Sequence, residues 1–401
     1  MIRIWSLLKD IGISILTILK SKYKWILIFF MLWVYRVSCM PADDGGMARG
    51  LQIATTLGML LFTFNMKGTG ISTALFKSKI PNQTMTWYLL LAMMSALWSY
   101  VPTLTLYIAF EKLIFVIVLT TIFSQFKTFE NAERAFVYFL LGIVIYNGIV
   151  PRMAGHVAFI AHDLQEGSCA AMAFSYCCGE MLAKKTKDKK RYGMLKAGML
   201  LSICFLAIST SGGANASAAL GFGIALLVCG KIVWGLFLLF IGGAIYFFKD
   251  LGDNIFKFLM AGKSDEDIKS ATGRTNIWEI VCDLAGQKPY LGWGHAALER
   301  YISDRGPTLL VDLHSNYYGS YGNNGIIGLI LLIVHHASAI FYTLGKRMKP
   351  GYVGLLCAIC CGALNGYSYG FLCGKTAIIT VVYFSVVVMI YIYSKVKVRN
   401  V

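Results

Sequence analysis

Charged residues are scarce in this chain of 401 residues. Asp, Glu, Lys and Arg together make up 14% of the sequence, whereas hydrophobic residues make up 57%. A soluble protein of this size carries roughly a quarter charged residues. Apolar runs close to the ~20 residues that cross a bilayer recur along the whole length. The scarcity of charge therefore excludes a soluble globular protein and predicts an all-α polytopic membrane protein.

Acidic residues are fewer than basic ones, 20 against 37, and the formal net charge is +17. A basic surface can indicate a nucleic-acid partner. Here, however, Lys and Arg gather in short segments between apolar runs, most densely at residues 184–191. This is the pattern of cytoplasmic loops under the positive-inside rule. We therefore expect the lipid bilayer, and no nucleic acid, as a partner.

The chain also lacks the patterns of a cleavable signal and of a metal site. The first strong apolar run has no small-residue cleavage site. Cys357 and Cys360 have C-x-x-C spacing, but no second pair accompanies them. His156, His162 and Asp163 match no strong ligand spacing. We therefore expect neither a cleaved leader nor a bound metal.

The alternation of apolar runs with basic segments predicts about twelve spans and two cytoplasmic termini. Residues 2–20 mix apolar and charged side chains and are expected to form an amphipathic helix at the inner face. We divide the chain into a membrane domain of nine spans (1–248), a large extracytoplasmic loop of short helices (249–324) and three final spans (325–401). The expected spans are residues 25–40, 51–66, 84–101, 104–123, 135–150, 167–183, 194–211, 216–229, 232–248, 325–344, 352–372 and 376–393.

The longest polar interval contains residue types that suit a site. A helix is expected to begin near Arg274, because Thr272 and Gly273 precede an apolar face, and Pro289 follows its end. A tight turn is expected at Gly292-Trp293-Gly294. The expected apolar face of the helix consists of Ile277, Trp278, Ile280 and Val281.

These residues give the chain a resemblance to the O-antigen ligase and O-antigen polymerase superfamily. That family has a G-R-x-x-x-W helix start, a P-x-x-G-x-G turn, a His shortly before G-x-x-G at the next span, and an Arg with Gly three residues on in an earlier outer loop. Where many members carry Ser-Arg near the eighth span, this chain has Gly212 and Gly213. The matching residues are Gly273, Arg274, Trp278, Pro289, Gly292, Gly294, His314, Gly325, Gly328, Arg152 and Gly155.

The resemblance implies three catalytic residues. His314 would accept a proton from the acceptor hydroxyl, since imidazole titrates near neutral pH. Arg274 and Arg152 would stabilise the leaving diphosphate, because guanidinium is a permanently charged fork. Two alternatives involve no catalysis: a loop salt bridge of Arg274 to Glu279 or Asp283, and a His314 that only caps the next span.

Four more residues are candidates for substrate binding. Arg300 and Arg305 flank Asp304 and suit phosphate or sugar, and pairing on the surface is the alternative. Asn316 follows the family His with Ser315 between them, where many members have Asn directly after the His. Tyr317 can stack on a sugar ring or belong to an interfacial aromatic belt.

Glu111 and Lys112 lie together within the expected fourth span. Charged residues at membrane depth are costly and often functional, so an ion path is one interpretation. The other is a mutually neutralised or snorkelling pair. The sequence leaves both open.

The resemblance implies a glycosyltransferase of the bacterial inner membrane with its site on the outer face. It would transfer a glycan from an undecaprenyl-diphosphate-linked donor to another glycan (polymerase) or to lipid A-core (ligase), inverting the anomeric carbon without metal or cofactor. A polysaccharide chain-length regulator is a further candidate partner. The alternative from another class is a flippase or transporter of lipid-linked oligosaccharides, which predicts paired repeats and broken helices. No internal repeat is evident in the sequence.

Overall fold

The computed structural model describes residues 12–13, 24–40, 45–64, 78–158, 163–184, 188–231, 233–235, 274–305 and 312–397. Within these ranges the chain is helical and contains no strand, apart from one isolated bridge between Thr128 and Lys397. The expected all-α class is confirmed for this part. The helices are α2 (Lys24–Cys39), α3 (Gly45–Phe64), α5 (Ile80–Met94), η1 (Ser95–Leu97), α6 (Pro102–Phe123), α7 (Phe129–Met153), α8 (Leu164–Ala183), α9 (Lys189–Ser209), α10 (Gly212–Val228), α14 (Arg274–Gln287), α15 (Leu298–Arg305), α16 (Asn316–Gly345), α17 (Tyr352–Ser368) and α18 (Ile378–Lys395).

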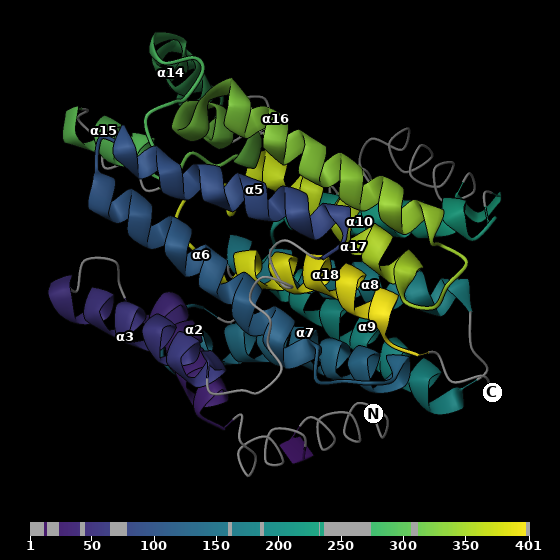
Figure 1. Ribbon diagram of the computed structural model, residues 1–401. Coiled ribbons are helices and arrows are strands. Elements are labelled where there is room, and N and C mark those ends of the chain that lie inside the picture. The colour runs from purple at the N-terminus through teal and green to yellow at the C-terminus, as the bar shows by residue number, and fades with distance from the viewer. Residues whose placement is uncertain are drawn as a thin grey trace.

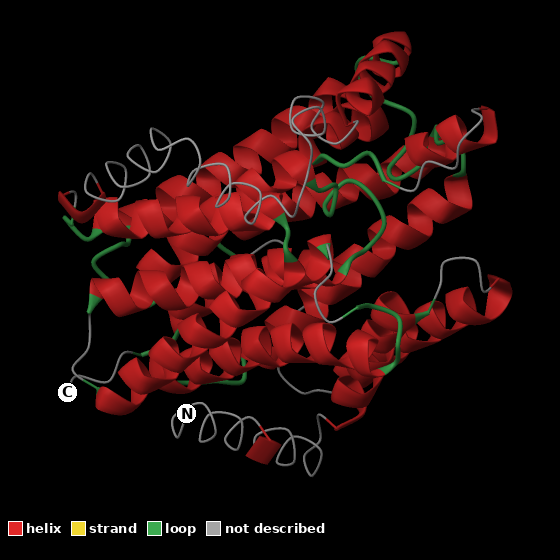
Figure 2. Ribbon diagram, turned by 180° about the vertical axis from the view of Figure 1, so that it is seen from behind, coloured by secondary structure: helices red, strands yellow, loops and turns green. Residues whose placement is uncertain are grey.

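The long helices run back and forth between two ends of a bundle, and α14 and α15 lie at the end away from the C-terminus (Figures 1 and 2). We call this end the loop end and define it by residues 98–101, 288–297, 312–315 and 369–377. The opposite end, the basic end, consists of residues 124–128, 188–191, 346–351 and 396–397. Backbone hydrogen bonds join separate segments within each end. Tyr100 N donates to Trp293 O at 3.0 Å at the loop end, and Phe129 N donates to Lys397 O at 3.0 Å at the basic end.

Helix α18 forms the centre of the bundle. Its sequence is apolar on every side, with Val, Ile and Tyr at most positions, and every side chain from Ile378 to Tyr393 is buried. It packs against α5, α6, α7, α8 and α17. A helix that is hydrophobic all round is buried by its neighbours, which accounts for this central place.

Small residues bring α8, α10 and α17 close together. A Cβ at Gly221 of α10 would lie 2.3 Å from Ser175 Oγ of α8. A Cβ at Gly354 of α17 would lie 2.7 Å from the Tyr176 carbonyl oxygen of α8. Membrane helices that lack large side chains at an interface approach in this way.

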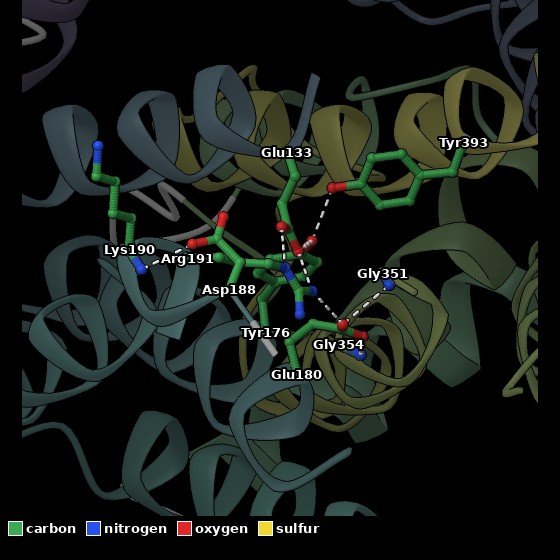
Figure 3. A network of polar contacts seen from close by, with 9 residues as sticks. All are labelled: Glu133, Tyr176, Glu180, Asp188, Lys190, Arg191, Gly351, Gly354 and Tyr393. Carbon is green, nitrogen blue, oxygen red and sulfur yellow. Dashed lines mark hydrogen bonds and ion pairs between the residues drawn. The ribbon is translucent and has the colours of Figure 1, made fainter. Parts of the chain in front are cut away.

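Buried charges hold the basic end together (Figure 3). The Arg191 guanidinium, near the start of α9, donates to both oxygens of Glu133 on α7 and, at 2.6 Å, to Glu180 on α8. The three side chains are 7% exposed or less. Glu180 also accepts from the backbone nitrogens of Gly351 and Gly354, both at 2.9 Å, at the start of α17. One arginine therefore connects α7, α8, α9 and α17.

Six of the described helices are long and apolar enough to cross a membrane. They are Gly46–Phe64, Pro102–Phe123, Phe129–Met153, Lys189–Ser209, Asn316–Gly345 and Ile378–Lys395. The helix at the expected span 325–344 begins nine residues before residue 325. It is α16, which starts at Asn316 and continues through a break at Gly325. The end of the expected outer loop is thus helical.

Three predictions fall largely or wholly outside the described residues. They are the amphipathic helix over 2–20, the span over 232–248 and the first part of the outer loop before Arg274. His162 is outside as well.

Candidate functional site

The described part of helix α14 covers Arg274–Gln287, and its end just before Pro289 agrees with the sequence prediction. Trp278 and Val281 are buried on its inner face, whereas Ile280, expected beside them, is 48% exposed. The Trp278 ring stacks on Tyr318 of α16, with centroids 4.8 Å apart and planes at 12°. Its Nε1 donates to the Leu313 carbonyl oxygen at 3.1 Å. The helix therefore fixes the segment that leads to His314.

The two glycine motifs of the loop end are packed against each other. Gly292 and Gly325 have φ of +67° and +66°, which favour glycine. A Cβ at Gly292 would lie 2.5 Å from the Asn323 carbonyl, and one at Gly325 would lie 2.2 Å from the Tyr290 oxygen. Ile326 N donates to Pro289 O at 2.8 Å. The Gly292-Trp293-Gly294 turn therefore packs against α16 at the break near Gly325.

His314 lies in the short segment between α15 and α16. Its φ is +54°, a left-handed conformation that His adopts more readily than most residues. Asp312 shapes this turn, since its Oδ1 accepts from His314 N at 3.0 Å. Asp312 Oδ2 lies 3.7 Å from His314 Nδ1, and the imidazole is 32% exposed. Asp312 thus holds the His314 backbone, and the imidazole lies near its carboxylate and is open on one side.

Arg274, Asp312 and His314 interact electrostatically. Burial lowers the pKa of His314, the Asp312 carboxylate raises it against that effect, and the Arg274 guanidinium lowers it again. Burial also lowers the pKa of Arg274, and Asp312 raises it. The net effect lowers the pKa of His314 and so favours the neutral form of the imidazole. Within the described ranges, Arg274 forms no ion pair with Glu279 or Asp283, the alternative drawn from the sequence.

Arg152 also faces the loop end, from the last turn of α7. Its guanidinium donates to the Gly148 carbonyl and to Glu166 Oε2, the latter at 2.7 Å. The Arg152 side chain is 12% exposed, and that of Glu166 is fully buried at the start of α8. Arg152 thus shares an end of the bundle with Arg274 and His314, and its charge is already paired.

Arg300 and Arg305 lie on the outer side of α15. Arg300 Nε pairs with Asp304 Oδ1 at 2.9 Å, and the Arg300 side chain is 55% exposed. Arg305 Nη1 donates to Tyr301 Oη at 2.6 Å, and its guanidinium lies 4.5 Å from that ring centroid. The surface pair named as the alternative for Arg300 is therefore present.

Asn316 and Tyr317 lie inside the bundle. Asn316 is fully buried, and its Oδ1 accepts from Leu372 N at 2.6 Å. Tyr317 Oη donates to the Ala363 carbonyl oxygen at 2.9 Å. These contacts connect the start of α16 to α17 and to the segment that follows α17.

Glu111 and Lys112 are both fully buried and have separate partners. Glu111 accepts from Trp33 Nε1 at 2.9 Å and from Gln52 Nε2 at 3.0 Å, on α2 and α3. Lys112 points toward the loop end and donates to the Leu372 and Gly374 carbonyl oxygens. Among the described residues these two side chains form no direct ion pair with each other.

Sequence reasoning did not single out Asp312, His295 or Glu299. Asp312 stands two residues before His314, the spacing of an Asx turn, and that spacing is a usable signal. His295 directly follows the glycine turn and is fully buried; burial and the Lys112 ammonium hold its pKa well below the usual value. Burial raises the pKa of Glu299 to about 7, with Asp312 raising it and Lys112 lowering it.

Among the described residues, no group of three or more His, Cys, Asp or Glu side chains is placed to hold a metal ion. The position of the family Ser-Arg pair is occupied differently here. A Cβ at Gly213 would lie 2.5 Å from Ser368 Oγ, so no side chain fits there without movement.

Comparison with known proteins shows that part of the chain matches a protein family. No curated protein matches the chain. The match to a family extends from α9 into α16, includes Arg274, Asp312 and His314, and leaves out Arg152 and Lys112. With the apolar helices, it indicates a multi-pass membrane protein and a glycosyl-transferring enzyme. Residues 197–333 match the family described as O-antigen ligase, and this match supports an assignment to the O-antigen ligase and polymerase superfamily.

Proposed function

We propose that the protein transfers a glycan from an undecaprenyl-diphosphate-linked donor to a sugar hydroxyl, on the outer side of the bacterial inner membrane. The observation that carries this proposal is that Asp312 lies against His314 at the loop end and that the charge of Arg274 acts on both residues. A neutral base, an orienting carboxylate and a cation are the groups that this displacement needs. The acceptor is another lipid-linked glycan or lipid A-core.

The reaction is a single displacement. His314 accepts the proton of the acceptor hydroxyl while that oxygen forms a bond to the anomeric carbon. The bond from this carbon to the diphosphate oxygen breaks, and the diphosphate leaves with the electron pair. Arg274 stabilises the charge that develops on it, and Arg152, held by Glu166, adds to the positive field. Attack from the opposite face inverts the anomeric configuration, without a metal.

The two ends of the bundle suggest its orientation. The basic end carries the residues that the positive-inside rule puts in the cytoplasm, including Arg191 and Arg347. We therefore propose that both termini are cytoplasmic and that the loop end faces outward.

The four predicted substrate-binding residues divide into two pairs. Arg300 and Arg305 are on the exposed side of α15, and they suit contacts to acceptor sugar or phosphate. Asn316 and Tyr317 are hydrogen-bonded within the bundle. We propose that Asn316 and Tyr317 help to hold the His314 segment in place through these hydrogen bonds.

The test is an assay of purified protein with lipid-linked oligosaccharide, without nucleotide sugar or metal. Longer lipid-linked chains would indicate a polymerase, and product on lipid A-core a ligase. His314→Ala and Arg274→Ala should lower the rate by roughly a hundredfold or more, since each removes a group acting in the transition state. His156→Ala is the matched control, because this His is exposed at the same end. Full activity of folded His314→Ala, or movement of lipid-linked glycan across vesicles without transfer, would overturn the proposal.

A further inference from the structure

The Lys112 ammonium is fully buried, and its three N–H groups meet three acceptors. It donates to Leu372 O at 2.7 Å, to Gly374 O at 2.6 Å and to His295 Nε2 at 3.0 Å. An ammonium has three donors and no acceptor, so these contacts satisfy it completely. One side chain on α6 thereby binds the glycine turn and the segment after α17.

The contact with Lys112 decides the tautomer of His295. Because Nε2 accepts from the ammonium, the proton of the neutral ring is on Nδ1. As placed, Asn324 Nδ2 lies 3.2 Å from Nδ1, and Asn324 Oδ1 has no hydrogen-bond partner in the described region. We therefore assign the amide with Oδ1 facing His295, since amide orientation is inferred from the bonding pattern. The chain of contacts then reaches α16 beside its break at Gly325.

The backbone held by Lys112 borders the candidate site. A Cβ at Gly370 would lie 2.5 Å from Asp312 Oδ1, and one at Gly374 would lie 3.2 Å from Glu299 Oε1. Cys373 Sγ donates to Ser315 O at 3.3 Å, on the residue after His314. Residues 370–374 are therefore the surface on which Asp312 and the His314 segment lie.

We propose that Lys112 is a positioning residue for the transfer reaction. Its ammonium holds residues 372–374 and the His295 turn at a fixed separation, and so keeps Asp312 and His314 in the geometry for proton transfer. Small displacements of a general base reduce catalysis strongly, because the reacting atoms must stay aligned. This inference rests on the proposed function, but the contacts that carry it are independent of Arg274 and Arg152.

Glu111 offers a matched control in the same helix. It is as buried as Lys112, but it binds Trp33 on α2, Gln52 and Thr56 on α3, and Tyr107 on its own helix. None of these residues belongs to the 370–374 segment. Glu111→Gln therefore disturbs a buried polar group of α6 without touching the surface behind Asp312. A general loss of helix stability affects both variants, whereas loss of positioning affects only Lys112→Met.

The first measurement is steady-state transfer by the full-length protein in lipid vesicles. Lys112→Met should lower kcat by roughly tenfold to a hundredfold, with the donor KM within about twofold of the original value. Glu111→Gln should keep kcat within about twofold. An equal fall in both variants, or a loss confined to KM, overturns the proposal.

The second measurement needs no activity. Cys373 lies within the held segment and is fully buried, so its thiol is reached by a polar reagent only when the segment opens. Labelling of this thiol by a polar maleimide, followed on its own peptide by mass spectrometry, should be several-fold faster with Lys112→Met than without it, because a released segment opens more often. Equal labelling rates overturn the positioning role. Absence of transfer by the original protein would contradict the proposed function alone, since the labelling comparison still applies.

If Lys112→Met does not fold, His295→Gln provides the same test. It removes one of the three acceptors and leaves the bonds of Lys112 to Leu372 and Gly374. We expect a smaller fall in kcat and a smaller rise in labelling, both in the same direction. No change in either quantity contradicts the proposal.

Discussion

The indole nitrogen of Trp278 donates a 3.1 Å hydrogen bond to the carbonyl oxygen of Leu313, the residue before His314. The same ring stacks on Tyr318, which lies just after His314 in the chain. Trp278 thus contacts both flanks of the proposed base. The tryptophan four residues after Arg274 has a clear physical role: it fixes the segment that Arg274 approaches from the same helix.

Trp278→Phe should slow transfer by roughly threefold to tenfold, because it removes one hydrogen bond, worth about 1 kcal/mol, and keeps a ring on Tyr318. The measurement is kcat of the purified protein at saturating donor. Tyr318→Phe is the control, since it preserves the stacked ring and should leave kcat unchanged. A Trp278→Phe protein with an unaltered kcat would show that the Leu313 bond does not matter for the reaction.

Asp312→Asn should move the acid limb of the pH–rate profile to lower pH. The base works only when deprotonated, so the midpoint of this limb follows the pKa of His314. The Asp312 carboxylate raises that pKa, and its loss lowers it; Asn retains an oxygen for the His314 backbone nitrogen. The measurement is kcat/KM against pH, with Lys190→Met, an exposed residue at the basic end, as the control whose limb should not move. A shift to higher pH contradicts the assignment.

Arg274→Gln should shift the same limb in the opposite direction. The guanidinium lowers the pKa of His314, so its removal raises that pKa and moves the limb to higher pH. The maximal rate should also fall by roughly a hundredfold, because the diphosphate loses its cation. The two effects are separable in one profile. A large fall in rate without any shift would place Arg274 away from His314 during catalysis.

Gly292→Ala should destabilise the protein by about 1–3 kcal/mol, because a residue with φ of +67° would then need a side chain in a space that the Asn323 backbone fills. Gly286→Ala is the matched control. It lies in α14 with nothing within 4 Å of the new Cβ, and should stabilise the helix by about 0.5–1 kcal/mol. Thermal unfolding in detergent measures both. Equal unfolding temperatures for the two variants would disprove the packing of the turn on α16.

Arg191→Met should cost about 3–5 kcal/mol, because it leaves the carboxylates of Glu133 and Glu180 buried without their cation. The rate per folded molecule should stay the same, since this group lies at the basic end. Lys190→Met, an exposed neighbour, should change neither quantity. Thermal unfolding and kcat are measured on the same samples. A lower kcat in folded Arg191→Met would indicate that the two ends are coupled.

Local sequence patterns predicted the bounds of single helices well. The expected end of α14 near Pro289 agrees with its last residue, Gln287, since the signal at this terminus is local. The first part of α16 was missed. Asn316 to Asn324 are too polar to read as a span, yet they are helical because their side chains bind neighbouring segments, as Asn316 binds Leu372 and Asn323 binds Leu298.

The site was predicted only in part for the same reason. His314 and Arg274 were identified by their motif, and their shared end of the bundle followed from the alternation of apolar and basic segments. Asp312 and His295 were not singled out, because their importance comes from contacts and not from spacing. Lys112, 183 positions from His295, contacts it only through the packing of α6 against the glycine turn.

The sequence alone determined that this chain is helical, apolar and polarised into a basic end and a polar end, because hydropathy and charge act on each segment independently. Only the tertiary structure decided which polar groups meet. It gave Glu111 and Lys112 different partners and paired Arg152 with Glu166. It also placed His314 where the charges of Arg274 and Asp312 act on it. A buried polar group must find a partner wherever packing leaves one, and no local pattern encodes that partner's position in the chain.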